Sequence, residues 1–401
     1  MSVNFTASFP PSRAAGLDRL ATFAPRAGQA YAFGRNADPG PGQPTAVSKL
    51  SPYARYRLLT EHEIVAAVLA QHSLVSAEKY VQEVFWRTYW KGWLELHPMV
   101  WSRFVAERNR QHDNFKDSRA IADAENGRTG IEGFDDWARE LVATGYLHNH
   151  ARMWFASIWI FTLRLPWALG ADFFLRHLID ADAASNTLSW RWVAGLQTVG
   201  KTYLATSENI ARYTAGRFAP AGLAQEAVAL TEPPVGAAQV LSVLPRTDPR
   251  QSSVLLVTHE DMNPESLFPA DTAIAASITI ADDKLLWGAL ARQFVAAATS
   301  DVAARMQSHL GCTAQVAKTL DLSTLIDAAQ TAGLRQIITP YAPVGPAADT
   351  LARLAPQLED QGIALVQCRR SWDDWLWPRA KRGFFPFKEY IPAYLKEEGL
   401  A

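Results

Sequence analysis

Apolar residues recur with a helical period from about residue 53 to residue 217, and glycine or proline mostly stands where such helices would end. This pattern predicts an all-helical domain, to which we assign residues 1–217. Residues 218–252 are rich in proline, glycine, alanine and small polar residues, as expected of a surface linker.

The pattern changes beyond the linker to short apolar runs that are separated by helical stretches, among them 283–309 and 347–360. The runs are SVLLVT, AIAASITI, RQIITPY and IALVQC, which begin at residues 253, 273, 335 and 363. Strands that alternate with helices predict a parallel sheet, so residues 253–401 are expected to form a Rossmann-like α/β domain. Gly333 and Gly362 each follow a helical stretch and precede a strand, where a left-handed cap favours glycine.

Composition narrows the class of protein. The 401 residues are 48% hydrophobic and 20% charged, which are globular proportions that exclude a disordered chain. Two cysteines, Cys312 and Cys368, are too few for a disulfide framework and favour a cytoplasmic location. Neither export nor a membrane span is expected, because the most apolar stretch is interrupted by Arg164 and Pro166.

Charge and aromatic content bear on possible partners. Lys and Arg total 39 against 40 Asp and Glu, so no global field attracts nucleic acid and any DNA binding has to be local. Ten of the 14 tryptophans lie between residues 86 and 192, which indicates that the two parts of the chain have different roles. The chain has no GxGxxG sequence and no GxxxxGK(S/T) sequence, so nothing indicates a dinucleotide fingerprint or a P-loop.

The first candidate motif is EVFWRTYWKGW, residues 83–93. Glu83 and Arg87 are four residues apart and share a helix face, with Trp86 beside them. The pattern is typical of a half-buried ion pair on an aromatic helix. The alternative is an aromatic wall with a carboxylate at its edge, which suits a heteroaromatic ring.

The second motif, TGYLHNHARMW, places Asn149, Arg152 and Met153 on one helix face. Such residues are commonly core or surface positions, and the alternative is a set that faces a ligand. His148 and His150 flank the asparagine, but no cysteine or acidic residue stands at metal-ligand spacing, so no metal site is expected.

The third motif, LIDADAASNTLSWRW, carries Asp180 and Asp182 before a helical run, where a carboxylate caps exposed amides. Capping explains one of the two carboxylates well. Asn186 and Trp190 share a helix face and can meet one ligand, whereas Trp192 points elsewhere. A glycosidase-like use of the two aspartates is a weak alternative, because neighbours on one segment rarely flank a bond from opposite sides.

The fourth motif, TAVSKLSPY, precedes a helix. The hydroxyls of Ser48 and Ser51, the ammonium of Lys49 and free backbone amides would suit a pyrophosphate. The alternative is a simple helix cap.

Together and in this order, the four segments resemble the flavin-binding domain of the photolyase and cryptochrome family over roughly residues 5–218. Residues 47–53 resemble the family's TSRLSPY stretch, and Tyr31 and Arg35 match an upstream tyrosine and arginine. EVFWRTY resembles an ELIWREF-like helix, TGYLHNHARM the TGW-HNR-RM motif, and DADAASNTLSWRW the DGD-A-N-WQW motif.

The resemblance implies FAD folded inside the helical domain. The implied cofactor contacts are Tyr31, Ser48, Lys49, Leu50, Ser51, Tyr80, Glu83, Arg152, Asp180, Asp182 and Asn186. The implied substrate contacts, around a cavity for a flipped pyrimidine dimer, are Arg35, Trp86, Asn149, His150, Met153 and Trp192. The implied catalytic residues are Glu83, which stabilises charge on the dimer, Asn186, which faces flavin N5, and Trp190 and Trp167, the inner and middle members of an electron-transfer chain.

The implied function is that of a deoxyribodipyrimidine photolyase-like lyase. Photoexcited reduced FAD would pass an electron to a cyclobutane pyrimidine dimer in UV-damaged DNA, held in a local groove. The alternative is a cryptochrome-like blue-light photoreceptor without repair activity, and a (6-4) photolyase fits less well because Asn149 follows His148 where that class has paired histidines. A second, antenna chromophore stays open, and a monomer is favoured.

Three positions depart from the family pattern. His150 stands where repair enzymes usually have arginine, and Val47 replaces a threonine. The outermost tryptophan of the electron-transfer chain falls near Phe115, so photoreduction would need Trp101, Trp137 or another aromatic residue.

The order of the two parts also departs from the family, whose members place an antenna-binding α/β domain first. Here SVLLVTHEDM resembles the family's first strand, and WDDWLWPRAKRGFFPFKEYIPAYL resembles the segment that ends the antenna domain. This order implies a circular permutation in which residues 218–252 form a new connector. The alternative is a generic α/β domain fused downstream.

Overall fold

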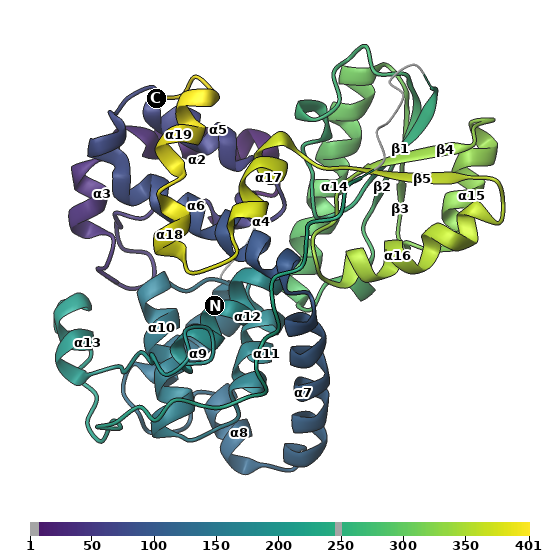
Figure 1. Cartoon of the computed structure of the whole chain (residues 1–401). Helices are drawn as coiled ribbons and strands as arrows, with labels where there is room; N and C mark the ends of the chain where they lie inside the picture. The colour runs from purple at the N-terminus through teal and green to yellow at the C-terminus, as the bar shows by residue number, and fades with distance from the viewer. Residues whose placement is uncertain (1–7, 245–250) are drawn as a thin grey trace.

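The computed structural model describes residues 8–244 and 251–401 (Figure 1). The helices of the first part are α2 (Arg13–Phe23), α3 (Gln29–Gly34), α4 (Ser51–Arg55), α5 (Glu61–Leu69), α6 (Leu74–Leu96), α7 (Met99–Phe115), α8 (Arg119–Glu125), α9 (Phe134–Thr144), α10 (Asn149–Ser157), α11 (Trp167–His177), α12 (Ala183–Val193) and α13 (Ser207–Tyr213). Two short helical turns join them, the 3₁₀ turn η1 (Ala24–Arg26) and the π-helical turn η2 (Ile158–Thr162).

The second part alternates strands and helices. Its elements are β1 (Ser253–Val257), η3 (Pro264–Ser266), β2 (Ile274–Ile280), η4 (Asp283–Leu285), α14 (Ala289–Leu310), β3 (Thr313–Ala317), α15 (Leu322–Thr331), β4 (Gln336–Pro340), α16 (Pro346–Glu359) and β5 (Ala364–Cys368). The chain then ends in α17 (Ser371–Leu376), η5 (Trp377–Arg379), α18 (Phe384–Lys388) and α19 (Ile391–Glu397).

Polar residues fix the starts of the helices that position the site. Thr60 and Glu63 form a reciprocal capping box at α5, in which each side chain accepts a hydrogen bond from the backbone of the other. The Asp182 side chain accepts from the first amides of α12, at 2.9 Å from Ala184 N and 2.8 Å from Ser185 N. The capping role predicted for one of the two aspartates therefore belongs to Asp182.

The sheet is five-stranded and wholly parallel, in the order β3-β2-β1-β4-β5. The interior strands β1 and β4 are buried along their whole length, as expected for strands that are covered on both faces. The predicted order of a helical part followed by a parallel α/β part is confirmed. Gly333 and Gly362 have φ values of 67° and 70°, which confirms their predicted left-handed conformation.

The sequence pattern missed β3 and α15. Edge strand β3 reads TAQVA and contains only exposed and half-buried positions. A strand at the edge of a sheet buries little, so it carries no apolar run for a pattern to detect.

Alternate residues of β1 face two different cores. Val254 and Leu256 pack with Leu325 of α15 and Leu351 of α16. On the other face, Leu255 and Val257 belong to a core that also contains Phe294 of α14 and much of the helical part. The ring of Phe294 stacks on Tyr56, with centroids 5.3 Å apart. Helix α14 is thus the layer between the sheet and the helical part.

The C-terminal helices α17 and α18 pack on α6 of the helical part rather than on the sheet, and α19 lies on the same side of the molecule (Figure 1). Trp372 Nε1 donates a hydrogen bond to Thr88 Oγ1 at 2.9 Å, and its ring lies 4.8 Å from that of Phe85. The predicted α/β domain, residues 253–401, includes these helices, and their contacts with α6 join its carboxyl end to the helical part. The domain limits stay a prediction.

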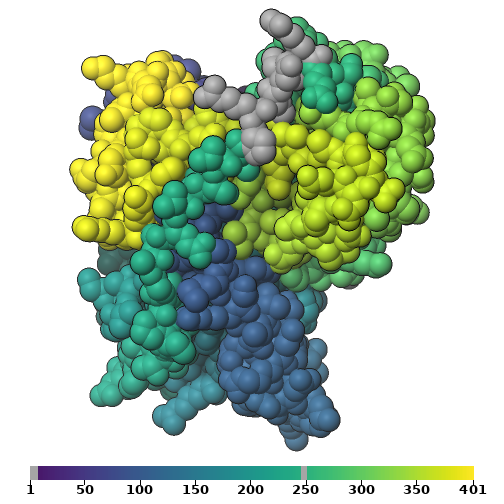
Figure 2. Space-filling view, turned by 45° about the vertical axis from the view of Figure 1, so that its right-hand side comes forward, coloured from purple at the N-terminus to yellow at the C-terminus, as the bar shows by residue number. Residues whose placement is uncertain are grey.

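The linker follows the surface of the helical part in an extended form, and Figure 2 shows it crossing toward the α/β part. Arg191 Nη1 of α12 donates to Glu232 Oε2 at 2.6 Å, and Gln239 N donates to Leu96 O at 2.8 Å. The predicted linker also includes residues 245–250, which lie outside the described residues. In the ranges that the structure describes, no helix is long and apolar enough for a bilayer span.

Candidate functional site

A cavity of about 700 Å³ lies in the helical part, a volume typical of cofactor sites. Its walls come from α3, α6, α10 and α12, and the C-terminal helix α18 adds Phe385. The predicted site residues that line it are Tyr31, Arg35, Glu83, Trp86, Asn149, His150, Arg152, Met153, Asp180, Asn186, Trp190 and Trp192. The fold therefore brings the predicted site residues of three of the four motifs to one cavity.

The other predicted site residues do not line this cavity; they are Ser48, Lys49, Leu50, Ser51, Tyr80, Asp182 and Trp167. Tyr80 packs edge-on behind Tyr31, with ring centroids 5.0 Å apart. The turn before α4 contains Lys49 in a left-handed conformation, with φ 51°, and its Nζ lies 5.7 Å from the ring centroid of Tyr146. Val47, next to this turn, does line the cavity.

Two half-buried tryptophans present planar surfaces to the cavity. Trp86 stacks on Phe384, with centroids 3.8 Å apart and an interplanar angle of 11°. Trp192 stacks on Tyr203, with centroids 5.7 Å apart. Because each ring is held by an aromatic partner, its orientation is fixed before any guest arrives. Together with Met153, the two rings suit a flat apolar guest.

The predicted ion pair between Glu83 and Arg87 is not formed, and that interpretation was wrong. Glu83 instead pairs with Arg35 of the turn after α3, while Arg87 pairs with Glu61 and Asp182. The pattern located both charges on one helix but could not show which elements pack against it. Burial raises the pKa of the Glu83 carboxyl, and the Arg35 guanidinium partly opposes this.

Asp180 lines the cavity and carries one buried acceptor without a partner among the described residues. Its Oδ2 accepts from Arg152 Nη2 at 2.9 Å, whereas its buried Oδ1 has no hydrogen-bond partner among the described residues. Asn186 Nδ2 donates to Ala171 O at 2.9 Å, which fixes the orientation of that amide at the cavity wall. A buried acceptor without a partner costs free energy, so this wall fits a ligand that carries hydroxyl or N–H donors, as FAD does.

The two histidines of α10 carry little positive charge at neutral pH. Burial lowers the pKa of His148 to about 4, and this side chain accepts from His150 N at the helix start. Burial also lowers the pKa of His150, whose Nδ1 lies 3.0 Å from Asn36 O and whose ring stacks on Trp154. His150 therefore supplies little positive charge to the cavity wall at neutral pH.

Trp190 and Trp167, which are predicted to carry electrons, lie on α12 and at the start of α11. Trp190 is buried, and α11 packs directly on it: a Cβ on Gly170 would lie 2.4 Å from the Trp190 ring. Trp167 begins the same helix and contacts Phe104, with centroids 5.6 Å apart. Phe104 lies 5.5 Å from Trp101, so an aromatic series continues beyond Trp167 away from the cavity.

Behind the cavity lies a cluster of buried charges that the sequence patterns did not reveal. Asp182 Oδ2 lies 3.6 Å from Arg55 Nε, 3.4 Å from Arg87 Nη1 and 3.9 Å from Lys91 Nζ. These three cations lower the pKa of Asp182 well below its usual value despite burial. Glu260, which follows β1, accepts two hydrogen bonds of 2.9 Å from Arg55.

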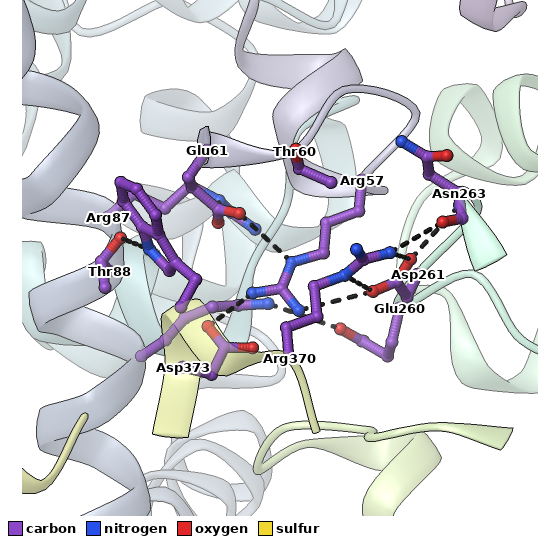
Figure 3. Close-up of polar contacts among 12 residues, drawn as sticks. Arg57, Thr60, Glu61, Arg87, Thr88, Glu260, Asp261, Asn263, Arg370 and Asp373 are labelled. Carbon is purple, nitrogen blue, oxygen red and sulfur yellow. Dashed lines mark hydrogen bonds and ion pairs between the residues drawn. The ribbon is translucent and has the colours of Figure 1, made fainter. Parts of the chain in front are cut away.

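The cluster extends to the C-terminal segment, as Figure 3 shows. Arg57 Nη2 donates to Asp373 Oδ1 at 2.7 Å. Arg370 binds Asp261 through two hydrogen bonds of 2.7 and 2.8 Å. Charges from the helical part, from the end of β1 and from the start of α17 thus neutralise one another behind the site.

Several cavity residues were not predicted from the sequence; they include Asn36, Trp90, Phe174, Ser185, Ser189, Tyr203, Asn209, Tyr213 and Phe385. Ser185 and Ser189 lie on α12 beside Asn186, so the helical period could have found them. Phe385 lies about two hundred residues from the motifs, and its only sequence signal is an aromatic pair after a basic run.

Fold and cavity together define a class of protein: a helical domain built around a cofactor-sized cavity, followed by a parallel α/β part. Residues 80–215 match the family described as the FAD binding domain of DNA photolyase. With this match, residues 80–215 of the helical part belong to the photolyase and cryptochrome family. The α/β part comes second here, and this order suggests a circular permutation.

Known relatives match part of the chain. The deoxyribodipyrimidine photo-lyases of Alkalihalophilus pseudofirmus and Streptomyces griseus are 31% and 34% identical to it over 160 and 154 residues. These matches cover 40% and 38% of this chain, and the chain spans about a third, 33%, of each relative. A crystal structure of a bacterial class III photolyase from Agrobacterium tumefaciens has 25% sequence identity and a TM-score of 0.45, and the alignment covers 54% of this chain and 46% of that one.

Proposed function

We propose that this protein splits cyclobutane pyrimidine dimers in UV-damaged DNA by light-driven electron transfer, with FAD as its cofactor. The observation that carries the proposal is one cavity that combines polar groups suited to a flavin nucleotide with two fixed tryptophan rings suited to a flipped pyrimidine dimer. The matched relatives are named photo-lyases, and we propose the same activity for this chain.

The cofactor is held by the polar wall of the cavity. Asp180 Oδ1 would accept a hydrogen bond from a donor of FAD, and Arg152 orients that carboxylate. Asn186, fixed by its bond to Ala171 O, presents its amide to the same guest. When bound, FAD supplies light-driven one-electron chemistry. A second, antenna chromophore gains no support from the comparisons.

The substrate is held by the aromatic end of the cavity. Trp86, Trp192 and Met153 replace the stacking that a dimer loses when it leaves the duplex, which costs less than for an intact base pair. Arg35 donates hydrogen bonds to carbonyl oxygens of the dimer. Burial raises the pKa of Glu83, and its carboxyl, when protonated, would donate a hydrogen bond to an oxygen where negative charge develops.

A cryptochrome-like photoreceptor without repair activity is the second candidate. Two observations favour it: His150 supplies no positive charge beside the cavity, and the aromatic series from Trp167 continues through Phe104 rather than through an indole. Both candidates use the same cofactor wall and differ in whether the aromatic end receives a lesion.

The deciding experiment illuminates the purified yellow protein with a single-stranded oligothymidine that contains one cyclobutane dimer. Repair restores thymine absorbance near 260 nm in the light and not in the dark. A flavin-loaded protein that never restores absorbance would eliminate repair and leave the photoreceptor. A protein that takes up no FAD would refute both candidates.

Glu83→Ala tests the role of the carboxyl. We expect the repair yield per absorbed photon to fall by about tenfold or more, because one positioned hydrogen bond to developing charge is lost, while the flavin absorption spectrum is retained. Asp123→Ala, at an exposed ion pair of α8, serves as the matched control. Equal repair by Glu83→Ala and the parent protein would contradict the assigned role.

A further inference from the structure

Segment 379–388, RAKRGFFPFK, reaches the cavity wall through Phe385 and has no part in the proposed chemistry. Phe385 of α18 lines the cavity, yet 72% of its surface is exposed. Among the described residues it is the one large hydrophobic side chain that is both exposed and part of this cavity wall. Because the Phe385 ring is exposed at the cavity wall, it is free to contact a guest of the cavity.

The segment holds Phe385 in a fixed place. Its neighbour Phe384 is buried and stacks on Trp86, the ring that faces the proposed lesion. Tyr89 Oη donates to Arg382 O at 2.7 Å, and the Phe387 ring lies 5.5 Å from that of Tyr89. Phe385 therefore stands beside the tryptophan wall on an anchored backbone rather than on a loose tail.

The surroundings of Phe385 are cationic. Residues 379–388 contain four cations and no carboxylate. Lys381 and Arg382 are exposed, and the Nζ of half-buried Lys388 lies 5.8 Å from the Phe385 ring centroid. Within the described part of the chain, none of these three side chains forms an ion pair, so their charge is available to an anionic partner. In a chain of net charge −1, this is a local positive site beside an exposed ring.

We propose that Phe385 stacks on the nucleobase that flanks the flipped dimer, and that Lys381, Arg382 and Lys388 bind the adjacent phosphates. An exposed aromatic ring among unpaired cations is the combination that single-stranded nucleic acid recognises through its bases and backbone. The inference rests on the proposed function, since it names how the same cavity selects a strand of DNA around the lesion. This inference makes segment 379–388 part of the substrate site.

Fluorescence anisotropy with a labelled single-stranded oligothymidine that contains one dimer tests the stacking. Phe385→Ala should weaken binding and raise the dissociation constant about tenfold, since a base stacked on an aromatic ring accounts for roughly 5- to 100-fold in affinity. Phe385→Trp should retain parent affinity. Phe33→Ala is the matched control, because Phe33 is 95% exposed but does not line the cavity. All variants should keep the parent flavin spectrum.

Salt dependence tests the phosphate contacts separately. The double variant Lys381→Ala/Arg382→Ala should reduce the slope of log affinity against log salt concentration by about 1.4, at roughly 0.7 for each lost contact to a single strand. Phe385→Ala should leave that slope unchanged. An unchanged slope in the double variant would overturn the assignment of these cations.

The outcomes separate this inference from the proposed function. If the parent binds and repairs the oligonucleotide while Phe385→Ala binds equally well, the stacking role is refuted and repair stands. If Phe33→Ala weakens binding as much as Phe385→Ala, the loss of affinity reflects a general decrease in surface hydrophobicity, and the inference fails. If the parent neither binds nor repairs the damaged strand, the proposed function itself fails.

Discussion

At the scale of single residues, Lys91 shows how strongly this interior departs from water. It lies on α6 with 3% of its surface exposed, and its Nζ has no hydrogen-bond partner among the described residues. The carboxylates of Asp182 and Glu260 are each 3.9 Å away. Burial and repulsion by Arg87 nevertheless outweigh these attractions and lower the pKa of Lys91 to about 8.

Lys91→Met should change how stability depends on pH. The pKa of Lys91 is lower in the folded than in the unfolded chain, so the unfolded chain binds more protons between pH 8 and about 10.4. In that window the parent's free energy of unfolding should rise with pH relative to the variant's, by up to about 3 kcal/mol. Urea unfolding at several pH values measures this difference. The exposed Lys79→Met on the same helix is the control, and an equal pH dependence in parent and Lys91→Met would refute the expectation.

At the scale of elements, the contact between α6 and the C-terminal segment depends on the absence of a side chain. Gly92 lies inside α6, where glycine is ordinarily unfavourable. A Cβ at this position would lie 2.8 Å from the Cα of Trp377, the first residue of η5. The helix therefore gives up local stability so that η5 and the flanking helices α17 and α18 can pack against it.

Gly92→Ala should destabilise the protein even though alanine is the better helix former. Overpacking against the Trp377 backbone is expected to cost about 1–3 kcal/mol, against a gain of about 1 kcal/mol from helix propensity. Chemical unfolding measures the net effect. Gly236→Ala is the control, since no atom lies within 4 Å of its added Cβ and its φ is not positive. Stabilisation by Gly92→Ala would contradict the close approach.

At the scale of the whole molecule, the α/β part and the helical part are joined by charges as well as by an apolar core. Arg55 and Glu260 are separated by 205 residues and form a buried, bidentate pair. Asp182, at the start of α12, shares the same guanidinium. The helix that carries Asn186 and Trp190 therefore depends electrostatically on a residue from the end of β1.

Glu260→Gln should destabilise the folded protein by about 3–5 kcal/mol, because Arg55 would lose the nearer of its two buried counter-charges. The double variant Arg55→Met/Glu260→Leu should recover most of that loss, since an apolar pair of similar volume removes both desolvated charges. Glu107→Gln at an exposed pair is the control, with an expected effect under about 1 kcal/mol. Thermal unfolding of all three variants measures these differences, and a parent-like Glu260→Gln would refute the charge-based junction.

Much of the local structure was predictable from the sequence alone. The apolar period predicted the helical part, and the apolar runs predicted four of the five strands, because both patterns reflect which side of an element is buried. The placement of Asn149, Arg152 and Met153 on one helix face follows from 3.6 residues per turn, whatever packs against that face.

Which remote residues contact one another was decided by the tertiary structure alone. Glu83 pairs with Arg35 instead of Arg87, Glu260 reaches Arg55 across the junction, and Phe385 arrives at the cavity from the far end of the chain. A hydrophobic period in the sequence indicates that one face of a helix or strand is buried, but it does not indicate which other element buries that face. Ion pairs and cavity walls depend on the distance in space between remote segments, which only the packed chain fixes.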